Sequence, residues 1–221
     1  KAANEAYNKA TSLKPDYAEA HNNLGICFQY QGKFEDAVEA YIKSISLKPD
    51  YADAHNNMGG SLRDLCKFGE ALNAYNKALL INPNYADAHF NSSLIYNLKG
   101  DFQRGLKLYE WRLKRKLFSA TAPRKDLIWD GDKSLSGKKF LVYEEQGLGD
   151  VTQFSRYLHL LKQKGAAVTF KVNQKMHALL NTIDSDILLV DSYADDDKTD
   201  FESPLMSLPY LFKTNLDTIP S

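Results

Sequence analysis

The residues best suited to chemistry lie in the loop Gln146-Gly-Leu-Gly-Asp150, which follows a short apolar run. Gly147 and Gly149 permit positive φ and a close approach of the backbone to a ligand. The free N–H groups that open the next helix favour an anion. Asp150 is the candidate reactive group, although a carboxylate at the start of a helix also serves as an N-cap. We therefore expect a ligand-binding loop, with the N-cap role of Asp150 as the alternative.

Several familiar sites are excluded by spacing. The loop is not G-x-G-x-x-G, because Thr152 occupies the third glycine position, and no acidic residue ends the second expected strand at Val172. These departures argue against a nicotinamide cofactor. No Gly-Lys-Ser/Thr follows, so the loop is not a phosphate loop. The acidic run 195–197 with Asp200 is interpreted as solvent-facing rather than as a metal site. We therefore predict no cofactor and no metal in this chain.

A second group of polar residues recurs at one fixed interval along the chain. Asn23, Asn57 and Asn91 share this spacing. A carboxamide donates and accepts at once, so a row of them can pair with a peptide backbone. Each such bond contributes about 1 kcal/mol net. The alternative is a purely structural bond. Histidines recur at the same interval, and their separation by a full repeat favours packing or a groove hydrogen bond over metal binding: His21, His55 and His89.

The same interval organises the first half of the chain. Prolines and tyrosines repeat in register, at Pro15, Pro49 and Pro83 and at Tyr17, Tyr51 and Tyr85. Each unit divides into two helices, because a turn interrupts it midway and proline ends it. The units span residues 1–17 (partial), 18–51, 52–85 and 86–117. The expected helices are 1–14, 18–30, 34–47, 52–65, 68–81, 86–98 and 102–116. Such hairpins must stack to bury their apolar faces, which predicts an α-solenoid.

This pattern resembles the tetratricopeptide repeat family. The segment His21-Asn-Asn-Leu-Gly25 is similar to the repeats of O-GlcNAc transferases, whose asparagine ladder holds extended substrate. The resemblance implies that the first helix of each unit lines a concave groove. It also implies that Asn23, Asn57 and Asn91 bind a polypeptide ligand there. The third unit departs from the pattern, because Arg112 occupies a usually small position and Leu117 replaces the expected proline.

The second half follows a different pattern. Residues 118–137 are expected to be a linker, which Trp129 packs onto the next domain. Residues 138–221 alternate between expected strands at 139–143, 167–172, 187–190 and 200–202 and helices at 151–164, 174–182 and 205–212. Strand–helix alternation predicts a small α/β, Rossmann-like domain.

This domain resembles the acceptor domain of bacterial tetratricopeptide glycosyltransferases, which are similar to heptosyltransferases. The matching segments are Gln146–Asp150, Gln153-Phe154, Arg156–Leu158, Pro204–Pro209 and Thr218–Pro220. The resemblance implies that Asp150 is a general base, and that Gln146, Gly147 and Gly149 contact a glycan or protein acceptor. It implies a nucleotide sugar as donor in a longer protein, held by a second domain. The chain by itself is then inactive. The alternative is a non-enzymatic scaffold with a degenerate α/β domain.

The amino-acid composition limits the classes of partner that we expect. Lys plus Arg equals Asp plus Glu at 28 each, so no net field favours nucleic acid or an anionic membrane. No apolar run approaches the length that spans a bilayer. We expect a fragment, since the chain starts with Lys1 inside a repeat, and we expect a reducing, cytoplasmic compartment. Cys27 and Cys66 are expected to be small buried fillers, with a disulfide as the alternative. The basic residues 112–116 are interpreted as a solvated helix end rather than a nucleic-acid site.

Overall fold

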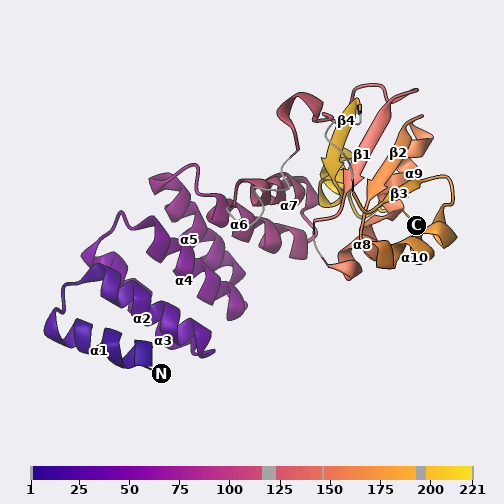
Figure 1. Cartoon of the computed structure of the whole chain (residues 1–221). Coiled ribbons are helices and arrows are strands. Elements are labelled where there is room, and N and C mark those ends of the chain that lie inside the picture. Colours follow the sequence, from indigo (N-terminus) through magenta and orange to yellow (C-terminus); the bar gives the residue numbers. More distant parts are fainter. Residues whose placement is uncertain (1, 116–122, 146, 193–197, 221) are drawn as a thin grey trace. The chain divides into compact units, whose positions relative to one another are not determined.

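The computed structural model describes residues 2–115, 123–145, 147–192 and 198–220 (Figure 1). It divides into two compact units, Lys1–Lys99 and Gly100–Ser221. This division differs from the boundary at residue 117 that the repeat register predicts, because the last expected repeat helix falls in the second unit. Leu117 and residues 195–197 lie outside the described residues.

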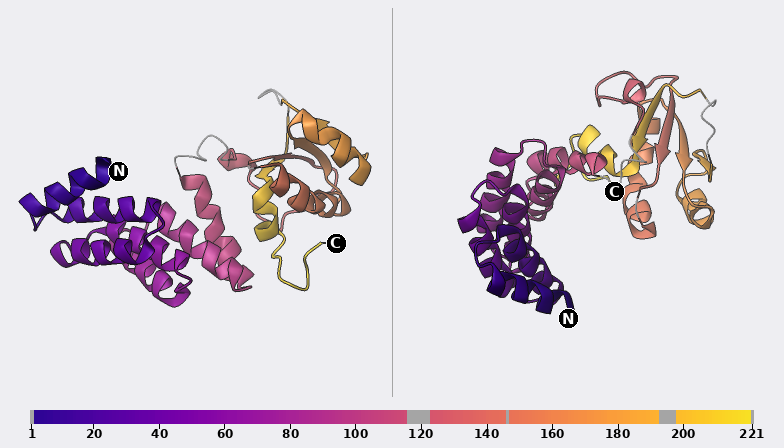
Figure 2. Two further views of the ribbon diagram at one scale, coloured as in Figure 1. Left: turned by 90° about the horizontal axis from the view of Figure 1, so that it is seen from below. Right: turned by 60° about the vertical axis from the view of Figure 1, so that its left-hand side comes forward.

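The first unit is an array of helices that follows the predicted repeat. Its helices are α1 Ala2–Leu13, α2 Ala18–Tyr30, α3 Phe34–Leu47, α4 Ala52–Asp64, α5 Phe68–Ile81 and α6 Ala86–Leu98. In both views of Figure 2 they lie side by side in sequence order, from indigo to magenta. We call α2, α4 and α6 the A helices, and α1, α3 and α5 the B helices. Every expected helix of this unit is present, with ends that agree within one residue.

Close packing inside the first two complete hairpins depends on a glycine in the A helix that faces a tyrosine in the B helix. Tyr41 and Tyr75 are fully buried. A Cβ added to Gly25 would lie 2.6 Å from the Tyr41 ring, and one added to Gly59 would lie 2.5 Å from the Tyr75 ring. Both distances are far below van der Waals contact, so only glycine fits at these two positions.

We predict that Gly59→Ala lowers the free energy of unfolding by about 1–3 kcal/mol, because the buried Tyr75 ring has no room to move. Urea unfolding followed by circular dichroism measures the loss. Gly69→Ala is the matched control, since a Cβ at Gly69 meets nothing within 4 Å. Equal stability of the two variants would contradict this packing argument.

The turn between the helices of a hairpin requires a left-handed residue. Gly32 and Gly100 adopt φ values of 73° and 77°, and Cys66 stands at the equivalent position of the middle unit with φ 59°. The expectation of two buried cysteines is therefore wrong. Cys66 is exposed in the turn and Cys27 is half-buried, and both are free thiols.

Because a left-handed conformation costs a non-glycine residue about 1–2 kcal/mol, Cys66→Gly should raise the free energy of unfolding by about 1 kcal/mol. The midpoint of urea denaturation reports the gain. Cys66→Ala retains a Cβ and serves as the control that removes only the thiol. If both substitutions shift the midpoint equally, backbone strain is not the reason.

The second unit contains a four-stranded sheet in the order β3-β2-β1-β4. All neighbouring pairs are parallel. Phe140, Val142 and Phe170 are almost fully buried, as expected for parallel strands covered on both faces. The strands are β1 Lys139–Tyr143, β2 Ala167–Lys171, β3 Leu188–Val190 and β4 Phe201–Pro204.

The helices of this unit are shorter than expected. The predicted helix 151–164 is wrong as a single element: it is split into α8 Leu148–Phe154 and α9 Arg156–Gln163. Side chains at the junction bind main-chain carbonyls: the Ser155 hydroxyl donates to the Thr152 carbonyl (3.1 Å) and Arg156 Nε to that of Gln153 (2.7 Å). The other helices are α10 His177–Ile183, preceded by a 3-10 turn at Gln174–Met176, and α11 Leu208–Leu211, preceded by one at Leu205–Ser207.

The expected helix 102–116 is also interrupted. It consists of α7 Phe102–Tyr109 and a 3-10 helix, η1, at Glu110–Lys114. The described part of the segment before β1 contains a further 3-10 turn, η3 Lys125–Leu127. Trp129 is fully buried and meets Phe140 and Phe212 edge-on, with ring centroids 5.7 and 5.5 Å apart. The prediction that Trp129 packs the connecting segment onto the α/β domain is confirmed.

Candidate functional site

Five asparagines form a continuous chain of hydrogen bonds across the A helices. Asn91 Nδ2 donates to Asn56 Oδ1 and Asn57 Nδ2 donates to Asn22 Oδ1, both at 3.1 Å. Within a helix, Asn56 Nδ2 donates to Asn57 Oδ1 (3.5 Å) and Asn22 Nδ2 to Asn23 Oδ1 (3.4 Å). Each bond between helices runs from a unit to the one before it. The three predicted asparagines are thus brought into one line.

The two kinds of asparagine differ in exposure. Asn22 and Asn56 are buried, with 3% and 8% of their surface exposed, whereas Asn23, Asn57 and Asn91 are half-buried. A carboxamide has two N–H groups and two acceptor lone pairs, so the half-buried ones retain capacity for a ligand. Asn57 therefore forms a structural hydrogen bond to Asn22 and still has a partly accessible carboxamide. Sequence reasoning missed Asn22 and Asn56, although the tandem Asn-Asn of the first two complete units is a visible signal.

The repeated histidines close the preceding turn. His21, His55 and His89 place Nε2 at 3.0, 3.0 and 2.9 Å from the carbonyl oxygens of Pro15, Pro49 and Pro83. A carbonyl oxygen only accepts, so Nε2 carries the hydrogen in each ring. Among the described residues no group of three or more His, Cys, Asp or Glu side chains is placed to hold a metal.

The glycine-rich loop lies after β1, at the carboxyl edge of the sheet. Gly147 is the N-cap of α8, with φ −70°, and Asp150 is the third residue of that helix. Asp150 is half-buried, and its carboxylate forms no hydrogen bond or ion pair with any residue that the structure describes. The N-cap interpretation of Asp150 is therefore wrong. Gln146 lies outside the described residues.

The reason given for the two loop glycines is also corrected. Neither Gly147 nor Gly149 adopts positive φ. A Cβ at either position would meet nothing within 4 Å, so the backbone there faces open space. The loop geometry thus leaves room beside Asp150, but it does not require glycine for backbone strain.

A buried ion cluster stands beside this loop, which sequence reasoning did not foresee. Arg112 is fully buried and binds Glu145 through two hydrogen bonds, at 3.2 Å from Nε and 2.7 Å from Nη2. The Glu145 side chain is also fully buried. The expectation of a solvated basic helix end is therefore wrong for Arg112, because η1 turns its side chain into the interior of the second unit.

Two further groups complete the cluster. Arg112 Nη1 donates to Glu110 Oε1 (2.6 Å) and Nη2 to Ser207 Oγ (2.8 Å). The Ser207 hydroxyl in turn donates to Glu110 Oε2 at 2.8 Å. Burial by itself would lower the pKa of Arg112, but the carboxylates of Glu110 and Glu145 raise it above the ordinary value. The guanidinium therefore remains charged and connects η1, the end of β1 and the turn before α11.

Comparison with known proteins finds sequence profiles that match residues of the first unit. The sequence profile of the tetratricopeptide repeat matches residues 18–51 and 52–85, and a related TPR repeat profile matches residues 1–32. No curated protein matches the chain significantly.

Solved structures similar to the chain include two described as crystal structures of MamA, each 26% identical. The chain matches the first over 51% of its own length and 66% of the other chain, with a TM-score of 0.47. For the second these values are 50%, 61% and 0.46. The chain thus spans less than two thirds of either structure.

In the described part of the chain, no helix has the length and apolar character that crossing a membrane requires. On the strength of the profile matches, residues 1–85 are tetratricopeptide repeats.

Proposed function

We propose that the A helices α2, α4 and α6 bind an extended segment of a partner polypeptide. Tetratricopeptide repeats are protein-interaction modules, and the line of asparagines supports the location on this face. The A helices of neighbouring units contact each other, α2 with α4 and α4 with α6. Such contacts are expected of helices on the inner side of a curved array.

The amide chain is the observation that carries this proposal. Asn57 and Asn91 are held in place by bonds to Asn22 and Asn56, so little side-chain entropy is lost when they bind a ligand. The spare donors and acceptors suit peptide groups, which also donate and accept alternately along an extended chain. Recognition through the backbone is tolerant of the ligand's sequence.

The affinity of selected peptides tests this surface. Dodecapeptides are selected on this chain from a random phage library, and their dissociation constants are measured by calorimetry. We expect Asn23→Ala to weaken binding about fivefold, because it removes one hydrogen bond of about 1 kcal/mol. Asn57→Ala should weaken binding and also lower stability, because it leaves the buried Asn22 carbonyl without its donor.

Asn76→Ala is the matched control, since Asn76 is exposed on the B helix α5. It should leave both affinity and stability unchanged. If Asn23→Ala and Asn76→Ala bind the selected peptides as tightly as the unaltered chain, the A-helix surface is not the binding site.

A second candidate function is sugar transfer by a longer protein that contains this chain. The support is Asp150, half-buried and without a partner among the described residues, next to the open backbone of Gly147 and Gly149. The parallel sheet places this loop at the edge where α/β folds bind ligands. Extending the chain along its gene past Ser221 and assaying nucleotide-sugar turnover tests this candidate. Absence of turnover would favour the scaffold interpretation, which fits the repeats equally well.

A further inference from the structure

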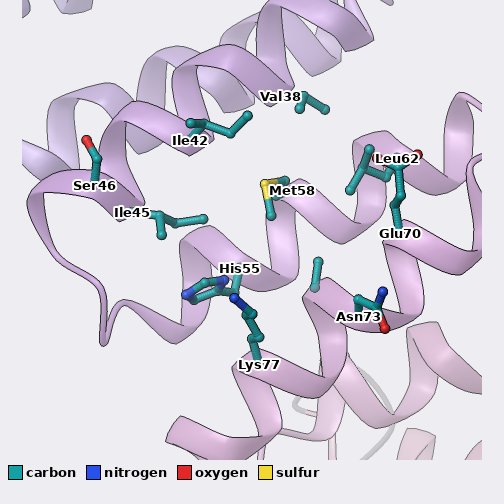
Figure 3. A pocket seen from close by; sticks show the side chains of 11 residues that line it. Val38, Ile42, Ile45, Ser46, His55, Met58, Leu62, Glu70, Asn73 and Lys77 are labelled. Atoms are coloured by element: carbon teal, nitrogen blue, oxygen red, sulfur yellow. The ribbon is translucent and has the colours of Figure 1, made fainter.

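A mainly apolar pocket lies on the B-helix side of the repeats, formed by α3, α4 and α5 (Figure 3). Its volume is about 460 Å³, within the range typical of ligand sites. Figure 3 shows side chains from all three helices around one hollow. Its apolar lining consists of Val38, Ile42, Ile45, Met58, Leu62 and Ala74. The asparagine line is built from other residues, so this pocket is a separate feature.

One apolar residue of this lining, Ile42, has a polar residue at the equivalent position of both neighbouring units. One repeat earlier in the sequence, the positions equivalent to Val38, Ile42 and Ile45 carry Asn4, Asn8 and Thr11. One repeat later, the position equivalent to Ile42 carries Asn76, whereas those equivalent to Val38 and Ile45 carry Leu72 and Leu79. Helix packing common to all units therefore does not require an apolar side chain at the position of Ile42. Ile42 is 55% exposed, and such exposure costs free energy unless another surface covers it.

Among the described residues, one buried polar atom of the lining has no hydrogen-bond partner. His55 is only 5% exposed, and its Nε2–H donates to the Pro49 carbonyl. In the neutral ring Nδ1 is then an acceptor, and among the described residues no group donates to it. A buried acceptor without a donor costs about 1–3 kcal/mol. The site is therefore complementary to a group that places a hydrogen-bond donor against an apolar lining.

Two charged residues border the pocket. Glu70 and Lys77 both lie on α5 and have opposite charges, so the pocket favours an uncharged ligand over an ion. In Figure 3 the Lys77 side chain points from α5 toward His55. Lys77 is exposed, so its flexible stem can swing away and open the route to Nδ1.

We propose that this pocket receives a tyrosine side chain of a partner polypeptide. Tyrosine combines a flat apolar ring with a single neutral O–H donor, which matches the lining and His55 Nδ1. The Met58 thioether adds a favourable contact with an aromatic ring. The B-helix side thereby holds an anchor site independent of the backbone-binding asparagines.

Binding of p-cresol, the side-chain analogue of tyrosine, tests the proposal against toluene, which lacks only the hydroxyl. Both are titrated into the full chain at millimolar concentration, and the methyl signals of Ile42 and Met58 are followed by NMR. We expect p-cresol to shift these signals and to bind about fivefold more tightly than toluene, the effect of one net hydrogen bond. Equal affinity, or no binding of either probe, would overturn the assignment.

Substitutions in the lining test whether p-cresol binds in this pocket. Ile42→Lys changes a half-exposed rim residue and should abolish binding of p-cresol while leaving the unfolding midpoint unchanged. His55→Phe should remove the preference for p-cresol over toluene. His21→Phe is its matched control, because His21 forms the same bond to a proline carbonyl outside the pocket. Retention of the preference in His55→Phe contradicts the role of Nδ1. If His55→Phe does not fold, the test depends on Ile42→Lys alone. Undiminished binding of p-cresol to Ile42→Lys would then overturn the assignment of the site.

N-acetyltyrosine methylamide distinguishes a polypeptide from a free small molecule. The open mouth between α3 and α5 should admit its two peptide groups, so it should bind at least as tightly as p-cresol. If p-cresol binds but the amide does not, the pocket takes a small phenol and the polypeptide assignment is overturned.

Discussion

Arg112→Ala is expected to lower the free energy of unfolding of the second unit by about 3–5 kcal/mol. The substitution removes the two guanidinium hydrogen bonds to the fully buried carboxylate of Glu145 and the donor to Glu110 and Ser207. Removal of one partner of a buried ion pair leaves an uncompensated charge, which is the reason for so large an effect. Denaturation followed by the fluorescence of the buried Trp129 reports on this unit.

Two further variants distinguish the loss of stability that comes from the buried ion pair from the effect of any substitution in α7 and η1. Lys107→Ala removes an exposed charge from α7 and should change stability by less than about 0.5 kcal/mol. Arg112→Leu combined with Glu145→Leu should recover part of the loss, because no single buried charge is then stranded. A loss below about 1 kcal/mol in Arg112→Ala would show that the cluster does not hold these elements together.

Asp150→Asn should lower the turnover of nucleotide sugar about 10²–10⁴-fold in a longer protein that transfers a sugar. An amide is isosteric with the carboxylate but does not accept a proton from an acceptor hydroxyl, and general-base catalysis contributes by about this factor. Because the Asp150 carboxylate forms no hydrogen bond or ion pair with a described residue, the variant should unfold like the parent. The initial rate of sugar transfer at saturating donor measures the effect.

Asp126→Asn is the control for this substitution. Asp126 is an exposed residue of η3 in the same unit, and its replacement should leave turnover unchanged. Undiminished turnover in Asp150→Asn would eliminate Asp150 as general base. An equal fall in both variants would attribute the loss to surface charge rather than to proton transfer.

The helices of the first unit could be predicted because local signals determine their ends. Each B helix that is followed by Pro49 or Pro83 ends just before the proline, and each hairpin turn needs a left-handed residue. The same reasoning failed for Cys66, because its apolar character suggested a buried site. Its position, equivalent to Gly32, was the better signal, since backbone geometry outweighs hydropathy in a tight turn.

The features of the second unit that were missed depend on contacts distant in sequence. Arg112 meets Glu145 and Ser207, which lie 33 and 95 residues further along the chain. Nothing local to Arg112 reveals these partners, so its basic neighbours suggested a solvated helix end. The interruption between α8 and α9 is local, and the side chains of Ser155 and Arg156 donate there to main-chain carbonyls, which the hydropathy pattern does not reveal.

Spacing identified the line of asparagines but not the way in which it is held. The constant interval places Asn23, Asn57 and Asn91 at equivalent positions, and this much is visible in the sequence. The bonds run through Asn22 and Asn56 to the neighbouring helix, one repeat away. Which side chain of a tandem pair faces the next unit depends on helix rotation, which the repeat alone does not give.

The side-chain amide signals of Asn23, Asn57 and Asn91 provide the most direct test of polypeptide binding to the A helices. These NH₂ groups are observed individually by ¹H–¹⁵N NMR and are assigned with the corresponding alanine variants. On titration with a selected dodecapeptide, we predict shifts of these signals while that of Asn76 on α5 stays in place. Shifts confined to Asn76 and the B helices, with the A-helix amides unmoved, would contradict the account.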